Sequence, residues 1–259
     1  MARSTGPGPA TGAETVSAHV IVASLDGPQG SSLELDSDAA HHLASVLRLR
    51  PGEAVGATDG RGGYLPCRYA GPGRLEPAGP PRMQPPRLPA LTVGFAPVKG
   101  DRPEWAVQKL TELGVDRIVV LDTDRGVVRW TGDRAASHLG RLEKVARSAV
   151  CQSRQLWVPV IEGPVPVRAL LEEAAASGTA GSGTGSGVAA AQMGGPPPHR
   201  GLHTVLVGPE GGWSPDELAG FPGAVGLGPS VLRAETAAVA AGVLLSALRA
   251  GVVSPGPAS

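Results

Sequence analysis

The 259-residue chain predicts an α/β protein of two domains, a small N-terminal β-barrel and a larger C-terminal domain whose parallel sheet is covered by helices. Three observations predict this class. Short apolar segments surround one helical segment in residues 18–76, and residues 77–89 have the proline-rich composition of a semi-rigid linker. Apolar strands then alternate with helical segments through residues 90–252, as expected for βα units that build a parallel sheet.

The N-terminal domain is expected to follow a disordered tail at residues 1–17, which is rich in Gly, Pro, Ser and Thr and offers little to bury. One helix is expected from Asp36 or Ser37 to Leu47, before the chain is broken at Pro51. The predicted strands of this domain occupy residues 19–22, 32–35, 54–57 and 63–69.

The C-terminal domain begins with three strand and helix pairs. Asp101 and Glu104 have the spacing of a capping box at the start of the first helix. Trp105 and Trp157 are expected in the core. The predicted strands are residues 90–96, 117–121 and 156–161, and the predicted helices are residues 102–113, 133–150 and 167–176.

Residues 177–201 form a low-complexity insertion of Gly, Ser, Thr and Pro within this domain. Nothing in this segment is expected to pack, so the composition predicts a mobile loop whose deletion costs little stability. Residues 253–259 are expected to form a short tail.

Two glycine-rich turns near the C-terminus each follow a short apolar strand and precede a helix. In the first turn, Gly208, Gly211 and Gly212 permit tight bends and a close approach of backbone to a ligand. Ser214 then has the position of an N-cap, and Glu217 completes a capping box around Pro215.

The second turn ends with Arg233, Glu235 and Thr236, a cation, an anion and a hydroxyl. The run at residues 237–245 carries almost no polar side chain on any face and predicts a buried helix. Two such turns, with charged residues between them, predict a ligand pocket built from backbone.

Several kinds of site are not predicted. Neither turn has the glycine spacing of a dinucleotide fingerprint or the lysine of a P-loop. The adjacent His41 and His42 point in different directions on a helix, so no metal site is expected. Cys67 and Cys151 form no disulfide framework, and the longest apolar run is shorter than the roughly 20 residues that span a bilayer. A cytoplasmic protein without a membrane segment is expected.

The formal net charge is zero, but the charges are segregated. Residues 48–155 hold 18 of the 23 Lys and Arg residues against 11 acidic residues, an excess of seven positive charges. This distribution predicts a basic face that attracts a polyanion such as RNA, although clustering by chance on a solvated surface is the alternative.

The two turns resemble the cofactor-binding end of the SPOUT methyltransferases, through Gly208-Pro-Glu-Gly-Gly-x-Ser214 and Leu227-Gly-Pro-x-x-Leu-Arg-x-Glu-Thr-Ala237. Further segments resemble one family of that group, the 16S rRNA uracil(1498)-N3 methyltransferases. These segments are His41-His-Leu-x-x-Val-Leu-Arg-Leu-Arg-Pro-Gly52, Lys99-Gly-Asp-Arg-x-Glu-Trp105, Gln108-Lys-x-Thr-Glu-Leu-Gly-Val115 and Gln152-Ser-Arg154. The resemblance covers roughly residues 18–250.

The resemblance implies a PUA-like RNA-binding domain, a SPOUT domain with a deep trefoil knot, a homodimer, and S-adenosylmethionine as the cofactor. It also implies 16S rRNA of the small ribosomal subunit as the substrate. The residues that it places around the cofactor are Leu206, Val207, Gly208, Gly211, Gly212, Leu227, Gly228, Leu232, Thr236 and Ala237.

The implied reaction is attack of uridine N3 on the methyl group of the sulfonium. Arg233 is the candidate that stabilises the uracil anion, because a fixed guanidinium can face developing negative charge. Glu210 or Glu235 is the candidate base, although positioning alone can carry much of the rate. Alternatively, Arg233 and Glu235 form a local ion pair, and Glu210 bonds loop amides or a partner subunit.

The candidate RNA contacts are basic or amide side chains in both domains, which position phosphates without reading sequence. Each of them taken singly is more often an ordinary surface residue. The candidates are Arg48, Arg50, Lys99, Arg102, Arg125, Arg129, Gln152 and Arg154.

Two other functions stay open. The first is a SPOUT methyltransferase that modifies another atom of rRNA or tRNA, such as a ribose 2′-hydroxyl. The second is an RNA-binding protein that retains the fold without catalysis. The segments at residues 41–52 and 99–105 count against the first, and the intact glycine turns count against the second.

Overall fold

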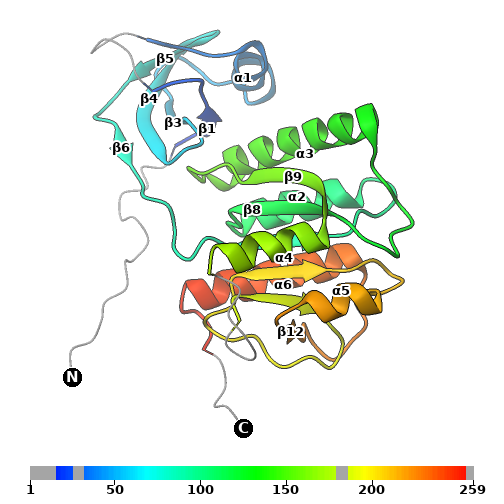
Figure 1. The fold of residues 1–259 in the computed structure, drawn as a ribbon. Helices are drawn as coiled ribbons and strands as arrows, with labels where there is room; N and C mark the ends of the chain where they lie inside the picture. The colour runs from blue at the N-terminus through cyan, green and yellow to red at the C-terminus, as the bar shows by residue number, and fades with distance from the viewer. Residues whose placement is uncertain (1–15, 26–31, 179–185, 255–259) are drawn as a thin grey trace, which may run out of the picture. The chain divides into compact units, whose positions relative to one another are not determined.

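The computed structural model describes residues 16–25, 32–178 and 186–254 (Figure 1). The chain divides into two compact units, Met1–Pro85 and Pro86–Ser259, each with its own core. The expected N-terminal tail falls almost entirely outside the described residues, as does most of the expected tail at 253–259. No helix among the described residues is long and apolar enough to cross a membrane.

Among the described residues, the N-terminal unit is a sheet of six mostly short strands, two more than the four predicted. Only the β1 and β3 pair is parallel, and the remaining pairs are antiparallel. Alternate residues of the strands, among them Val55, Ala57 and Leu75, are fully buried. The strands are β1 (Ala18–Ile21), β2 (Leu33–Glu34), β3 (Ala54–Thr58), β4 (Gly63–Gly71), β5 (Arg74–Pro77) and β6 (Arg82–Met83).

The single helical segment of this unit has two parts. Helix α1 (Ser37–His41) begins after Asp36, whose carboxylate accepts a hydrogen bond from the Ala39 amide at 2.7 Å. It continues as a π-helix, η1 (His42–Val46), which buries Leu43 completely. The predicted helix therefore exists, and its second half is more widely wound than an α-helix.

The proline-rich segment is not wholly a linker. Strand β6 lies within the segment expected to connect the domains, and it pairs with β4 through Gly63 and Met83. The N-terminal unit therefore extends further along the chain than its composition predicts, because two paired residues are enough to add a short edge strand.

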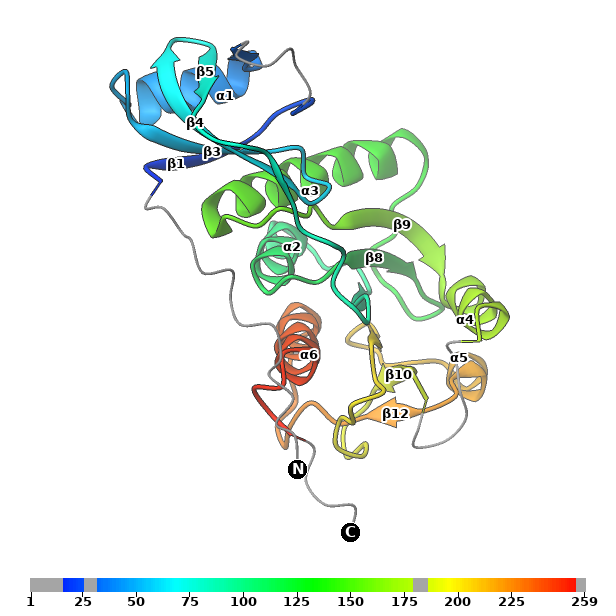
Figure 2. The same ribbon diagram turned by 90° about the vertical axis from the view of Figure 1, so that its left-hand side faces the viewer.

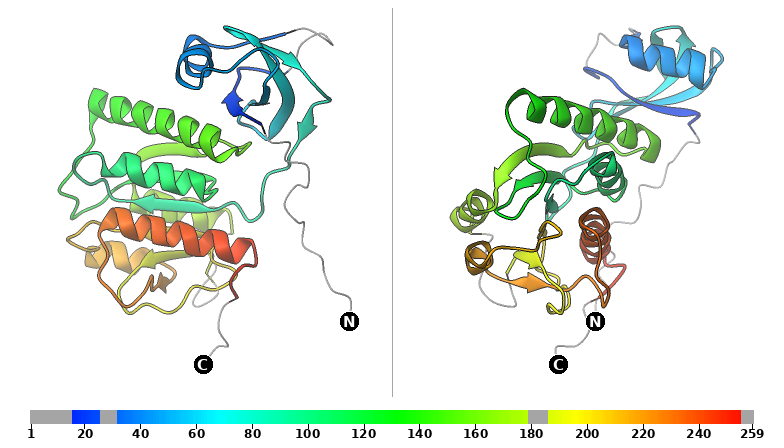
Figure 3. Two further views of the ribbon diagram at one scale, coloured as in Figure 1. Left: turned by 180° about the vertical axis from the view of Figure 1, so that it is seen from behind. Right: turned by 90° about the vertical axis from the view of Figure 1, so that its right-hand side faces the viewer.

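The C-terminal unit is a six-stranded parallel sheet in the order β12-β10-β11-β7-β8-β9. Its strands are β7 (Thr92–Phe95), β8 (Arg117–Asp122), β9 (Val160–Pro166), β10 (Val188–Ala191), β11 (Thr204–Val207) and β12 (Ala224–Val225). Helices α2 (Arg102–Glu112), α3 (Gly132–Ser153) and α6 (Ala234–Arg249) cover one face, and α4 (Val167–Ala176) and α5 (Pro215–Gly220) cover the other (Figure 2). Figure 3 shows the same two layers from behind and from the other side.

Alternation along the strands explains the two cores. Phe95 and Val205 pack with the α2, α3 and α6 side, whereas Val119 and Leu206 pack with α4 and the start of α5. In α6, Ala238 and Ala241 are fully buried but Val243 is exposed, so the predicted apolar helix exists and is buried on one side only. This arrangement places the loops that follow β10 and β11 beside the start of α6.

Three local predictions were wrong. The Asp101 side chain makes no capping bond, and Glu104 instead pairs with Arg141 from α3. Trp105 is 44% exposed rather than in the core. The third predicted strand begins at Val160, four residues later than expected.

The prediction that residues 177–201 cannot pack was also wrong. Strand β10 lies in this segment, between β11 and β12, with Val188, Ala189 and Ala190 at most 4% exposed. Two neighbouring strands supply its hydrogen bonds, so three alanines and one valine are sufficient for a buried strand. Residues 179–185 lie outside the described residues.

The segments that follow β10 and β12 cross at close range. The Gly226 amide donates to the Pro196 carbonyl at 2.8 Å, and the Gln192 amide donates to the Val225 carbonyl at 2.9 Å. A Cβ atom at Gly195 or Gly226 would lie within 2.7 Å of backbone atoms of the other segment. Glycine is therefore needed at both positions for this crossing.

Candidate functional site

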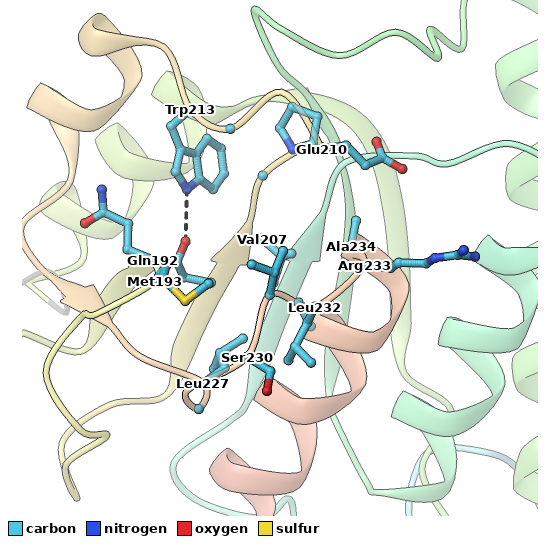
Figure 4. Close-up of a pocket in the computed structure, with 17 residues that line it drawn as sticks. Gln192, Met193, Val207, Glu210, Trp213, Leu227, Ser230, Leu232, Arg233 and Ala234 are labelled. Atoms are coloured by element: carbon cyan, nitrogen blue, oxygen red, sulfur yellow. Dashed lines mark hydrogen bonds between the residues drawn. The ribbon is translucent and has the colours of Figure 1, made fainter.

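The main candidate site is a pocket of about 410 Å³ in the C-terminal unit (Figure 4). Three segments enclose it: the residues that follow β10, the turn that follows β11, and the turn that leads into α6. Its lining residues are Ala191, Gln192, Met193, Val207, Gly208, Pro209, Glu210, Gly212, Trp213, Leu227, Gly228, Ser230, Val231, Leu232, Arg233, Ala234 and Ala237.

The turn after β11 follows from its glycines. At Gly208 a Cβ atom would lie 3.0 Å from the Trp213 ring, so a side chain there would displace the indole. Gly212 has a φ of +70°, which favours glycine, and its amide closes a tight turn on the Pro209 carbonyl at 2.8 Å. At Gly208 and Gly212 the turn thus presents backbone to the pocket.

The predicted capping box fixes the end of this turn. The Glu217 amide donates to the Ser214 hydroxyl at 3.1 Å, and the Ser214 amide donates to the Glu217 carboxylate at 2.8 Å. The Ser214 hydroxyl also lies 2.5 Å from the Asp124 carboxylate, and Arg125 donates to the Gly211 carbonyl at 3.3 Å. The loop after β8 therefore holds the turn from outside the pocket.

Trp213 connects the turn to β10. Its indole is 7% exposed and stacks at a tilt on Phe221, with ring centroids 5.0 Å apart. The indole N–H donates to the Ala191 carbonyl at 3.3 Å, a bond that is drawn in Figure 4. Trp213 is thus a rigid wall of the pocket.

The second turn leads into α6. Gly228 has a φ of +139°, and Leu227 and Leu232 pack partly into the core. Arg233 occupies the N-cap position, where its carbonyl accepts from the Ala237 amide at 2.8 Å and its side chain stays exposed. Figure 4 shows Arg233 and Glu210 extending from the same side of the pocket, opposite Gln192 and Met193.

Most of the predicted cofactor residues line this pocket, namely Val207, Gly208, Gly212, Leu227, Gly228, Leu232 and Ala237. Gly211 and Thr236 are exposed and lie outside the lining. Leu206 also lies outside it, because it is fully buried in the core on the other face of the sheet. Adjacent strand residues face opposite sides, so Val207 and Leu206 cannot both face the pocket.

Glu235 is separate from the two other predicted catalytic residues. Glu210 and Arg233 line the pocket, whereas the buried Glu235 pairs with Arg102 of α2 at 3.4 Å. The alternative of an Arg233 and Glu235 ion pair was therefore wrong. The second carboxylate oxygen of Glu235 is buried and has no hydrogen-bond partner among the described residues.

The predicted RNA contacts fall into two groups. Seven of the eight residues are exposed, namely Arg48, Arg50, Lys99, Arg125, Arg129, Gln152 and Arg154, whereas Arg102 is half-buried. Arg102 pairs with Glu235, Arg125 donates to the Gly211 carbonyl, and Arg129 pairs with the exposed Asp122 at 2.9 Å.

Sequence reasoning missed the lining contributed by β10. The apolar run at residues 188–191 was the available signal, but the surrounding Gly and Pro residues hid it. The other missed residues are sequence neighbours of predicted ones and line the pocket because they lie in the same turns. The missed residues are Ala191, Gln192, Met193, Pro209, Trp213, Ser230, Val231 and Ala234.

A metal centre is not part of the described site. Across residues 16–25, 32–178 and 186–254, no group of three or more His, Cys, Asp or Glu side chains is arranged to hold a metal ion. The pocket instead offers apolar side chains, glycine-rich backbone and the two charged residues Glu210 and Arg233, which suits an organic ligand.

Two family models match the chain. Residues 85–246 match an RNA methyltransferase domain, and residues 35–75 match an RNA methyltransferase PUA domain. The chain is therefore an RNA methyltransferase that carries a PUA domain.

Individual relatives narrow this class. The ribosomal RNA small subunit methyltransferase E of Mycobacterium bovis is 37% identical over 84% of this chain and 88% of that protein. A ribosomal RNA small subunit methyltransferase E from Neisseria gonorrhoeae, bound to S-adenosyl methionine, superposes with a TM-score of 0.71 at 27% identity, over 89% of this chain and 97% of that one. The chain belongs to the ribosomal RNA small subunit methyltransferase E family, which confirms the resemblance noted in the sequence.

A methyltransferase from Legionella pneumophila, solved with bound S-adenosyl methionine, gives the same TM-score of 0.71 at 25% identity. It covers 90% of this chain, and this chain covers 97% of it. The two-unit fold is thus common to relatives that hold this cofactor.

Proposed function

We propose that the protein transfers the methyl group of S-adenosylmethionine to N3 of one uridine in the 16S rRNA of the small ribosomal subunit. The observation that carries this proposal is the pocket of three backbone segments with Glu210 and Arg233 at one side. The relatives with bound cofactor have the same fold, which supports placing the cofactor in this pocket.

The pocket residues fit this cofactor. Leu227 and Leu232 offer apolar surface to an adenosyl group, and the glycine turns expose backbone amides and carbonyls to its polar atoms. A side chain at Gly208 or Gly212 would strain or fill this cradle. When bound, the cofactor supplies an electrophilic methyl group on a sulfonium.

Arg233 is the proposed catalytic residue. Uridine N3 carries a proton at neutral pH, so the reaction needs either a base or stabilisation of the anion on the ring oxygens. The exposed Arg233 guanidinium can meet that anion, and Glu210, which extends on the same side of the pocket, can accept the proton. Precise positioning of uridine N3 against the methyl group of the cofactor reduces the need for a dedicated proton acceptor.

Glu235 is a proposed positioning residue rather than the base. Its carboxylate holds Arg102 at the start of α2, and its second oxygen lacks a partner among the described residues. A buried acceptor without a donor is costly, so we infer that a donor arrives with the RNA or a second subunit.

The exposed basic residues of both units are the proposed RNA contacts. Arg48 and Arg50 follow the π-helix of the N-terminal unit, and Lys99 and Arg154 lie on loops of the C-terminal unit. Such side chains position phosphates, and they leave the choice of uridine to the pocket.

We further infer a homodimer and a trefoil knot. Helix α6 leaves a stripe of apolar residues that a second subunit can cover, namely the exposed Val243 and the half-buried Val239, Ala240 and Ala247. The close crossing at Gly195 and Gly226 supports a threaded chain at this end of the sheet. An rRNA substrate supports a cytoplasmic location.

Mass spectrometry of rRNA nucleosides tests the function. In cells that lack the protein, 16S rRNA is expected to lose 3-methyluridine, and the wild-type gene is expected to restore it. Retained 3-methyluridine with loss of a ribose-methylated nucleoside would favour a different target atom. Loss of no modified nucleoside would favour a non-catalytic RNA-binding protein.

A further inference from the structure

Met193 is a long apolar side chain in the lining of the pocket. It lies two residues beyond β10, lines the pocket, and is 59% exposed. Leaving an apolar side chain of this size in water costs free energy that burial under a ligand would recover. Its position at the pocket rim therefore points to a ligand contact.

The backbone that carries Met193 is fixed on both sides. The preceding Gln192 amide donates to the Val225 carbonyl at 2.9 Å, and the Ala191 carbonyl accepts from the Trp213 indole at 3.3 Å. Next in the chain, the Gly195 amide closes a turn on the Gln192 carbonyl at 3.2 Å. With the backbone held, the three rotatable bonds of the methionine side chain supply the freedom to adapt to a ligand.

The location of Met193 in the pocket indicates which part of the cofactor lies next to this side chain. Glu210 and Arg233 extend on the side of the pocket opposite Met193 (Figure 4). In the proposed function the methyl group of the cofactor faces the RNA and therefore lies toward Arg233. The adenosyl group then lies on the opposite side of the pocket, near Met193 and Leu227.

We propose that Met193 is an adaptable cover for the adenine ring of the cofactor, and that oxidation of its sulfur weakens cofactor binding. This inference rests on the proposed function. Thioethers make favourable contacts with aromatic rings, and adenine offers a flat aromatic face. Hydrogen peroxide transfers one oxygen atom to the sulfur, which gives a sulfoxide and water and makes the side chain polar.

Peroxide footprinting tests the contact, with Met83 as an internal control. Met83 lies in the N-terminal unit and is 69% exposed, so its accessibility is similar to that of Met193. The native protein is treated with hydrogen peroxide with and without saturating S-adenosylmethionine, and oxidation of each methionine is measured by peptide mass spectrometry. Bound cofactor is expected to slow oxidation of Met193 several-fold and to leave Met83 unchanged.

Calorimetry after removal of the peroxide tests the consequence. Oxidised wild-type protein and M193Q are expected to bind S-adenosylmethionine about two- to tenfold more weakly than untreated wild type, because the contact with the ring is lost. M193L has no sulfur at this position, so peroxide is expected to leave its cofactor affinity unchanged.

The outcomes separate this inference from the proposed function. Equal oxidation of Met193 with and without bound cofactor would overturn the inference alone, as would unchanged affinity in M193Q. If the untreated protein does not bind S-adenosylmethionine at all, the proposed function fails and the inference fails with it.

Discussion

Gly211 and Gly212 are adjacent in the turn after β11 but have different conformations. Gly212 has a φ of +70°, whereas Gly211 lies outside the positive-φ region, and a Cβ atom at Gly211 would be 3.5 Å from Arg125 in ordinary contact. Only Gly212 has a backbone conformation that side chains rarely adopt. The sequence alone makes the two glycines look equivalent.

Gly212→Ala is therefore expected to destabilise the turn by about 1 kcal/mol and to weaken cofactor binding, because left-handed backbone strains an alanine. Gly211→Ala is the matched control and is expected to change both quantities little. Calorimetry with S-adenosylmethionine and thermal unfolding measure the difference. Equal losses in the two variants would show that backbone conformation at Gly212 does not shape the pocket.

His203 gives a second prediction at the residue scale. Burial lowers the pKa of its imidazole below the ordinary value of 6.5, so the folded protein keeps this ring neutral at pH values where the unfolded chain binds a proton. The lowered pKa of His203 leaves the free energy of unfolding constant above pH 6.5. As the pH falls from 6.5 toward the pKa of the folded state, the free energy of unfolding decreases. His203→Gln is expected to flatten this decline in urea unfolding between about pH 5 and pH 8. Identical pH dependence in wild type and variant would contradict it.

Single residues of the site were predictable where backbone geometry requires a particular residue type. Glycine is needed at Gly208 and Gly212, and the capping box at Ser214 has a recognisable spacing. Side-chain direction was harder to predict. Whether Leu206 or Val207 faces the pocket, and whether Glu235 meets Arg233 or Arg102, depends on the face of the sheet and on residues far away in the chain.

Among the elements, β10 connects the edge strand β12 to the rest of the sheet and leads into one side of the pocket. It lies between β11 and β12, and its outgoing end forms the rim that holds Met193. Its composition does not reveal it, because four small apolar residues stand between Gly, Ser and Pro residues. Helices and strands with longer periodic patterns, such as α3 and β8, were predictable, because their burial repeats over several turns or residues.

Ala190→Asp tests the contribution of β10. Ala190 is 1% exposed at the centre of the strand, so an unpaired carboxylate there is expected to destabilise the unit by about 3 to 5 kcal/mol. Pro197→Asp, at an exposed position in the same segment, is expected to have little effect. Denaturant unfolding compares the two. A mild effect of Ala190→Asp would mean that the sheet tolerates loss of this strand.

At the scale of the whole molecule, the stripe on α6 predicts a dimer. Val243 is 45% exposed on a helix whose other side is buried. Val243→Glu is expected to give a monomer, because a second subunit would have to bury the carboxylate without a partner. Val127→Glu, at an 80% exposed position between β8 and α3, is the control and should stay dimeric. Light scattering measures the oligomeric state at micromolar concentration. A fully active wild-type monomer would show that the reaction does not need a dimer.

The two units suggest a division of labour between RNA binding and chemistry. Arg48 and Arg50 belong to the N-terminal unit and Arg233 to the C-terminal unit, and each unit has its own core. A surface substitution in one unit therefore leaves the fold of the other intact. Glutamine is the replacement in the N-terminal unit, because it removes the positive charge and keeps a long polar side chain at both exposed positions.

The double substitution Arg48→Gln and Arg50→Gln is expected to weaken RNA binding and to reduce its salt dependence by roughly one unit of slope for each lost phosphate contact. Arg233→Ala is expected to lower the single-turnover rate about 100- to 1,000-fold while RNA affinity changes little, because its charge acts on the uracil anion rather than on the bound substrate. Both are measured on small ribosomal subunits at saturating S-adenosylmethionine and several salt concentrations. A wild-type rate for Arg233→Ala at saturation would make its role structural, and an unchanged salt slope in the double variant would place the RNA on a different face.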